Sequence, residues 1–144
     1  MASSSITNRG NPPLVAGENL SPSRFIKLST SANQTALMCG NAERAFGITH
    51  DGQVTPPDLI AAIGGSADTP YAALSGMPFE YFATSQYALL ECGTAWTRAA
   101  LLTSDASGKG KTASSTNPVN AQALTSASAG EKRIVWIKDG WAAP

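Results

Sequence analysis

The sequence predicts an all-β fold, a small barrel or sandwich that follows an extended N-terminal arm and contains one short helix. Three observations lead to this expectation. Short apolar segments alternate with clusters of Gly, Ser, Asn and Asp, which is the pattern of strands joined by turns. Residues 1–24 carry a proline pair and no helical periodicity. Only residues 55–64 combine the start and stop signals of a helix.

The segment at residues 1–24 is predicted to be the extended arm. Pro12 and Pro13 lack backbone N–H donors and favour extended backbone. The apolar residues of the arm dock either on a neighbouring molecule or on the domain's own flank, and a disordered tail followed by a first strand is the remaining interpretation. Contact with a partner or a sister subunit is predicted for Pro12, Pro13, Leu14, Val15, Leu20 and Phe25.

A single β-rich domain is predicted at residues 25–144, because a chain of 144 residues that is 42% hydrophobic can bury one ordinary core. In its first half, Thr55 can cap the helix at residues 55–64 and Gly64 can end it. Strands are expected at residues 25–30, 35–39 and 43–49, the last closed by a turn at His50-Asp51-Gly52.

In the second half of the domain, a loop leads to the segment at residues 79–82, and the predicted strands follow at residues 87–92, 101–104, 111–113 and 134–137. Asp105-Ala106-Ser107-Gly108 places Gly108 where a hairpin loop requires positive φ. The segment from Ile134 to Ile137 is apolar on both faces, which is typical of a central strand and predicts that Trp136 lies in the core.

The charge inventory argues against several classes of partner. Ten Lys and Arg balance ten Asp and Glu, and only 14% of the residues are charged, so no basic face for nucleic acid can be built. No apolar stretch reaches the length of a membrane-spanning helix, and the first residues are unlike a secretory signal. Cys39 and Cys92 are therefore expected to be free and buried.

The sequence offers no set of catalytic or metal-binding residues. His50 is the only histidine, and it is expected in a surface turn. Gly108-Lys109-Gly110-Lys111-Thr112 invites comparison with a phosphate loop, but Asp105 stands where that loop needs its first glycine. We therefore expect neither an enzyme nor a cofactor, a metal or a small-molecule substrate.

The aromatic residues leave one alternative open. Trp96, Trp136, Trp141, Tyr71, Tyr81 and Tyr87 could form a platform on which sugars stack. Trp141 lies beyond the last predicted strand, where it either packs back on the domain or anchors an interface. Trp141 is accordingly a further candidate contact residue.

The run from Tyr87 to Ile137 resembles the head-decoration, or capsid cement, proteins of tailed bacteriophages. The resemblance lies in the apolar strand into Gly93, the hairpin from Leu101 to Lys109, the small-residue segment from Ala121 to Ala129 and Ile134-Val135-Trp136-Ile137. Glu43-Arg44-Ala45-Phe46-Gly47-Ile48 resembles an early strand of that family. The sequence differs at Ala99-Ala100, where the family commonly has a glycine at the turn before the strand.

This resemblance implies a β-barrel or β-tulip protein that is made in the host cytoplasm and sits on the outer face of the phage capsid. It implies binding to the major capsid protein, bridging of neighbouring capsid subunits and a homotrimeric state, with no nucleic acid or membrane partner. The alternative function is a carbohydrate-binding or host-attachment module displayed on the virion through Trp141 and the tyrosines.

Overall fold

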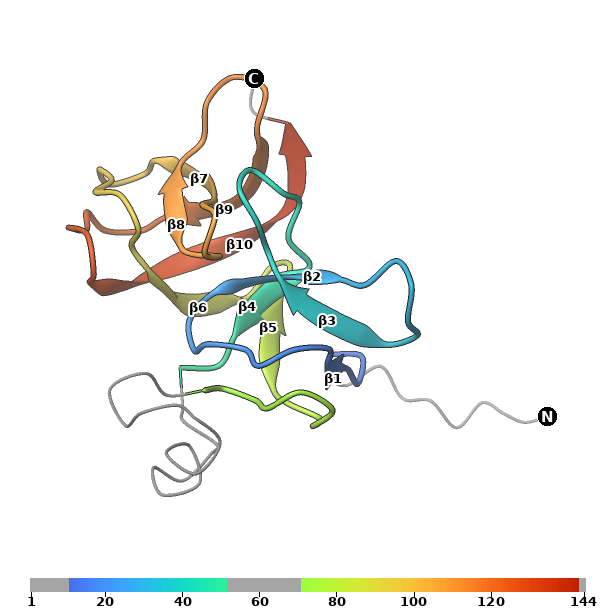
Figure 1. Cartoon of the computed structure of the whole chain (residues 1–144). Coiled ribbons are helices and arrows are strands. Elements are labelled where there is room, and N and C mark those ends of the chain that lie inside the picture. The colour runs from blue at the N-terminus through green and yellow to red at the C-terminus, as the bar shows by residue number, and fades with distance from the viewer. Residues whose placement is uncertain (1–10, 52–70, 143–144) are drawn as a thin grey trace.

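The computed structural model describes residues 11–51 and 71–142, with Gly140 to Ala142 described by their backbone alone, and the chain forms two five-stranded β-sheets (Figure 1). The predicted all-β fold is confirmed, whereas the predicted helix at residues 55–64 lies outside the described residues. The strands are β1 (Val15–Ala16), β2 (Phe25–Leu28), β3 (Thr35–Met38), β4 (Gly47–Thr49), β5 (Tyr81–Ala83), β6 (Tyr87–Glu91), β7 (Leu101–Ser104), β8 (Gly110–Thr112), β9 (Pro118–Ala123) and β10 (Lys132–Ala142).

The first sheet has the strand order β1-β3-β2-β4-β5, and only the short β1–β3 pair is parallel. Successive residues of a strand point to opposite faces, and β2 uses both faces. Phe25 enters the core between the two sheets, whereas Ile26 enters a second core on the other face. Gly47 of β4 is required by close approach, because a Cβ there would lie 2.3 Å from the carbonyl oxygen of Phe82.

The second sheet has the order β6-β10-β9-β7-β8 and curls into a half-barrel above the first sheet (Figure 1). Its two edges meet at one point, where the Gly93 N–H donates to the Gly110 carbonyl oxygen at 2.9 Å. Leu90 and Trp96 fill the space inside, because a Cβ on Gly110 would meet their side chains at 2.6 and 2.7 Å. Small residues such as Ala121 and Ala123 line the remaining interior, which suits a narrow barrel.

Polar contacts fix the half-barrel to the first sheet. Arg24 forms an ion pair with Glu91 at 2.7 Å, and the Phe25 N–H donates to the carbonyl of Gly108 in the β7–β8 hairpin at 2.8 Å. The buried Asn120 side chain holds the loop before β4, since it donates to the Glu43 carbonyl at 2.8 Å and accepts from the Ala45 N–H at 2.9 Å. The two sheets are therefore joined by specific bonds as well as by apolar packing.

Several local predictions can be compared with the structure. Gly108 has φ +79°, as the hairpin requires, and Ala99 adopts φ +67°, so this alanine takes the left-handed conformation expected of a glycine at that turn. Cys39 and Cys92 are free and buried. The prediction that Trp136 lies in the core is wrong: its neighbours Val135 and Ile137 are buried, and Trp136 is half-exposed on the opposite face of β10.

Candidate interaction surfaces

The described part of the N-terminal arm, residues 11–24, lies along the first sheet. Leu14 and Leu20 are 4% and 0% exposed, and they pack with Ile26, Ala73 and Tyr81 in the second core. Backbone bonds reinforce this position, because the Leu20 N–H donates to the Ala73 carbonyl at 2.8 Å and the Ala72 N–H donates to the Leu20 carbonyl at 2.7 Å. These side chains occupy the domain's own flank.

The seven predicted contact residues differ in burial: some side chains are buried, some are exposed, and one lies outside the described structure. Leu14, Leu20 and Phe25 lie in the domain's own cores, so a contact with another molecule would require them to leave those positions. Pro12, Pro13 and Val15 are exposed on the arm. Trp141 belongs to β10, where its backbone pairs with Val119, and its side chain lies outside the described structure. Contact with a partner stays a prediction for all seven residues, and in the observed arrangement Pro12, Pro13 and Val15 are accessible for it.

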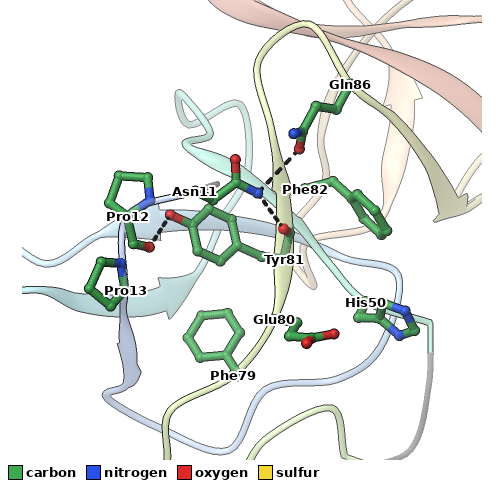
Figure 2. A pocket seen from close by; sticks show the side chains of 9 residues that line it. All are labelled: Asn11, Pro12, Pro13, His50, Phe79, Glu80, Tyr81, Phe82 and Gln86. Atoms are coloured by element: carbon green, nitrogen blue, oxygen red, sulfur yellow. Dashed lines mark hydrogen bonds between the residues drawn. The ribbon is translucent and has the colours of Figure 1, made fainter. Parts of the chain in front are cut away.

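The beginning of the arm is held against β5 by side-chain hydrogen bonds (Figure 2). The Tyr81 hydroxyl donates to the Pro12 carbonyl at 2.6 Å, and the Asn11 amide nitrogen donates to the Tyr81 carbonyl at 2.7 Å. The same nitrogen also donates to Oε1 of Gln86 at 3.2 Å. Burial raises the pKa of the Tyr81 phenol, so the hydroxyl stays protonated as a donor.

An open cleft of about 320 Å³ lies where the arm, β5 and the end of β4 meet (Figure 2); we call it the arm cleft. Aromatic rings form part of its wall: His50 and Phe82 stack with centroids 5.6 Å apart at 22°, and Phe79 packs against Tyr81. Polar groups complete the wall with the amides of Asn11 and Gln86 and the exposed carboxylate of Glu80.

The orientation of both amides in the arm cleft is fixed by their partners. Oε1 of Gln86 accepts from the Ala83 N–H at 2.7 Å as well as from Asn11, so the nitrogen of Gln86 is the free end. Because the Asn11 nitrogen donates to a carbonyl, the Asn11 oxygen is the free end. Within the described part of the chain, these two atoms make no hydrogen bond, which leaves one acceptor and one donor on the joined amide pair.

A second surface lies on the outer side of the half-barrel; we call it the apolar face. It consists of Tyr87 and Leu89 on β6 with Ile134 and Trp136 on β10, and the β-ladder places Ile134 opposite Leu89 and Trp136 opposite Tyr87. Tyr87 is 58% exposed, and Leu89 and Ile134 are 39% and 40% exposed. The Tyr87 and Trp136 rings meet edge to face at 4.8 Å. An exposed apolar cluster of this kind is typical of an interaction site.

The charges beside the apolar face are neutralised within the chain. Lys132 pairs with Asp51 at 2.6 Å, and Arg133 pairs with Glu131 at 2.6 Å. Burial opposes ionisation of Asp51, but hydrogen bonds from Lys132 and Ser23 outweigh it and hold the pKa of this carboxyl below its usual value. The face therefore presents apolar side chains with no uncompensated charge from these four residues.

The groups considered for catalysis or metal binding are dispersed in the described residues. No group of three or more His, Cys, Asp or Glu in residues 11–51 and 71–142 could hold a metal ion. His50 is exposed after β4, while the predicted turn reaches Gly52, outside the described residues. Lys111 of the β7–β8 hairpin donates to Asn41. Burial raises the pKa of the Cys39 thiol to about 12, which makes it a poor nucleophile.

The described aromatic residues of the proposed sugar platform are divided between the interior and the surface, and the Trp141 side chain lies outside the described structure. Trp96 is buried with its Nε1–H donating to the Thr125 carbonyl at 2.9 Å, and Tyr81 is buried beneath the arm. Among the aromatic side chains that the structure describes, Tyr87 and Trp136 share an outer face. Sequence reasoning missed both the apolar face and the arm cleft: Tyr87-Ala88-Leu89-Leu90 is apolar at every position, so the alternation of exposed and buried residues appears only in the structure.

Across the described residues there is no helix of the length and hydrophobicity needed to span a membrane. Neither a protein-family model nor a curated protein matches the chain. Among solved structures, the fold is similar to the head fiber gp8.5 N base of bacteriophage phi29. The TM-score is 0.59, and the similarity covers 92% of this chain and 96% of that chain at 12% sequence identity. At this identity the similarity concerns the fold alone.

Proposed function

We propose that this chain is a structural protein of a bacteriophage virion that binds the outer face of the head and stabilises it by bridging major capsid subunits. The observation that carries the proposal is the fold shared with a phage head fiber base over 92% of this chain. The sequence resemblance to capsid cement proteins supports the same class independently, because it rests on the residues themselves. In this proposal the protein acts by binding and not by catalysis.

The exposed part of the arm is the proposed contact with the major capsid protein. Pro12, Pro13 and Val15 are exposed, while Leu14 and Leu20 anchor the same segment in the core. Anchoring lowers the conformational entropy that would be lost on binding, since the segment is already extended and held. An extended segment can also offer backbone hydrogen bonds to a neighbour.

The apolar face is the proposed contact between copies of this chain, with a trimer as the expected state. Its bordering charges form pairs within the chain, and the net charge of the protein is zero, so copies can approach without electrostatic repulsion. Tyr87, the most exposed aromatic of the face, is of the residue type that is enriched in binding hot spots. Many such copies on one head gain attachment strength through multivalency.

The decisive experiment mixes the purified protein with heads that lack their surface proteins. Co-sedimentation with heads, and a higher temperature of head disruption after binding, are the expected results. Failure of the protein to co-sediment, or binding that leaves head stability unchanged, would contradict the cementing role. The variant Val15→Asp should weaken binding, whereas Ala106→Asp in the exposed β7–β8 hairpin turn is a matched control at a distance from the arm.

The state of association is tested separately by sedimentation equilibrium. Leu89→Asp should shift the wild-type oligomer to monomer, because an unpaired carboxylate would be buried in the contact. Leu28→Asp is the matched control, since Leu28 is 45% exposed but lies on the first sheet. A monomeric wild-type protein, or equal effects of the two variants, would refute self-association through this face.

A further inference from the structure

We propose that the arm cleft is a binding site for a neutral saccharide. This inference goes beyond the structural role proposed above and does not depend on it. The volume of about 320 Å³ lies at the lower end of ligand sites, roughly 300–1,000 Å³, and suits one or two sugar units.

The polar groups of the arm cleft match the hydrogen-bonding character of sugar hydroxyls. A hydroxyl donates one hydrogen bond and accepts others, so it is satisfied by a donor and an acceptor placed side by side. The free oxygen of Asn11 and the free nitrogen of Gln86 supply an acceptor and a donor on two amides that are joined at 3.2 Å through their other ends. Figure 2 shows both free atoms on the side of the amide pair away from the Tyr81 ring.

The amide pair is also held in place before any ligand arrives. Gln86 accepts from the Ala83 N–H, and Asn11 donates to the Tyr81 carbonyl, so each side chain is oriented by the backbone of β5. Groups that are already oriented lose little conformational entropy on binding. A small ligand such as a single sugar buries little surface, so its affinity depends on a low loss of conformational entropy on binding.

The aromatic wall supplies the second component of sugar recognition. The stacked rings of His50 and Phe82 present an apolar surface against which the C–H face of a pyranose can pack. The exposed carboxylate of Glu80 stands beside these rings in Figure 2 and can accept from two hydroxyls. The cleft thus combines an apolar surface with directional acceptors and one donor.

The charge of the arm cleft indicates which saccharides fit. Its described lining contains the carboxylate of Glu80 and the imidazole of His50 but no Lys or Arg, so it lacks the permanent positive charge that phosphorylated or carboxylated sugars require. A proline-rich peptide could use the aromatic rings. Its proline residues lack N–H donors, however, and would leave the acceptors of Asn11 and Glu80 unpaired. A neutral, hydroxyl-rich ligand satisfies all these groups.

The test uses the full chain and a panel of glucose, galactose, mannose, N-acetylglucosamine and their disaccharides, with binding followed by ligand-observed saturation-transfer NMR and by titration. At least one member of the panel should bind. Gln86→Glu retains an oxygen for Ala83 and Asn11 but replaces the free donor by an acceptor, and it should weaken binding about tenfold or more. Glu80→Gln should weaken it as well.

Glu18→Gln is the control, because Glu18 is an exposed carboxylate on the arm outside the cleft lining. This variant should bind the saccharide with the affinity of the wild type. Thermal unfolding midpoints verify that the variants are folded. The proposal is overturned if no saccharide of the panel binds, if both cleft variants bind as tightly as wild type, or if a proline-rich peptide binds in the cleft instead. None of these outcomes would affect the head-binding result.

Discussion

The variant Leu20→Ala tests how much docking of the arm contributes to the free energy of unfolding of the domain. Leu20 has no exposed surface and packs in the second core, while the backbone bonds of residue 20 to Ala72 and Ala73 do not involve the side chain. Truncation to alanine removes the three carbons of the isopropyl group, and burial of each CH₂ is worth about 0.8 kcal/mol. With a contribution from the cavity, the expected loss in free energy of unfolding is about 3 kcal/mol.

This loss can be measured by urea denaturation followed through tryptophan fluorescence. For a denaturant slope of about 1.5 kcal/mol per molar, the midpoint should fall by about 2 M. Val15→Ala is the matched control in the same arm, because Val15 is 37% exposed and its truncation should cost less than about 1 kcal/mol. A loss below about 1 kcal/mol for Leu20→Ala would refute the docked position of the arm.

Three further predictions concern the interior and the ion pairs. Cys39 and Cys92 should react with a thiol reagent only after unfolding, since both are buried and burial raises the pKa of each thiol; rapid labelling of the native protein would contradict this. Asn120→Ala should lower the unfolding free energy by about 3 kcal/mol, because the Ala45 N–H and Glu43 carbonyl lose their partner. Gln122→Ala is the control on the same strand, because its side chain makes a single bond to the Ala99 carbonyl, and it should cost about 1 kcal/mol. Equal losses for Asn120→Ala and Gln122→Ala would refute the role of Asn120 in holding the loop before β4. Stability should fall on acidification, because the pKa values of Glu43 and Asp51 are lowered in the folded state; this stability is present above their ordinary values of 4.5 and 3.8 and is lost as pH falls through the folded values. Asp51→Asn should reduce that acid sensitivity in pH-dependent urea titrations, and an unchanged profile would exclude Asp51 as a source.

Much of the local structure could be predicted because its signals act within a few residues. The β7–β8 hairpin follows from Asp105 and Gly108: the Asp105 carboxylate accepts from the Ser107 and Lys109 N–H groups, and Gly108 adopts positive φ. Strand positions in the second half follow from short apolar segments between turn residues. The strand predicted at residues 134–137 was too short, since β10 runs from Lys132 to Ala142, with an irregularity between Ile137 and Trp141.

The interaction surfaces could not be predicted, because they depend on which face of each strand is covered. Ile134-Val135-Trp136-Ile137 is apolar at every position, so its pattern cannot say which residues point inward. The half-barrel buries Val135 and Ile137 and leaves Ile134 and Trp136 outside. The arm cleft depends on even more distant partners, since Asn11 meets Tyr81 and Gln86, about half of the chain away.

The sequence by itself determined the all-β class, the positions of most strands and the β7–β8 hairpin, because backbone propensity, side-chain alternation and turn chemistry are local properties. Only the tertiary structure decided that Leu14 and Leu20 of the arm fill the second core and that Tyr87, Leu89, Ile134 and Trp136 share an outer face. The reason is physical: burial is set by which surfaces meet, and strands that are apolar on both sides are compatible with either face inward.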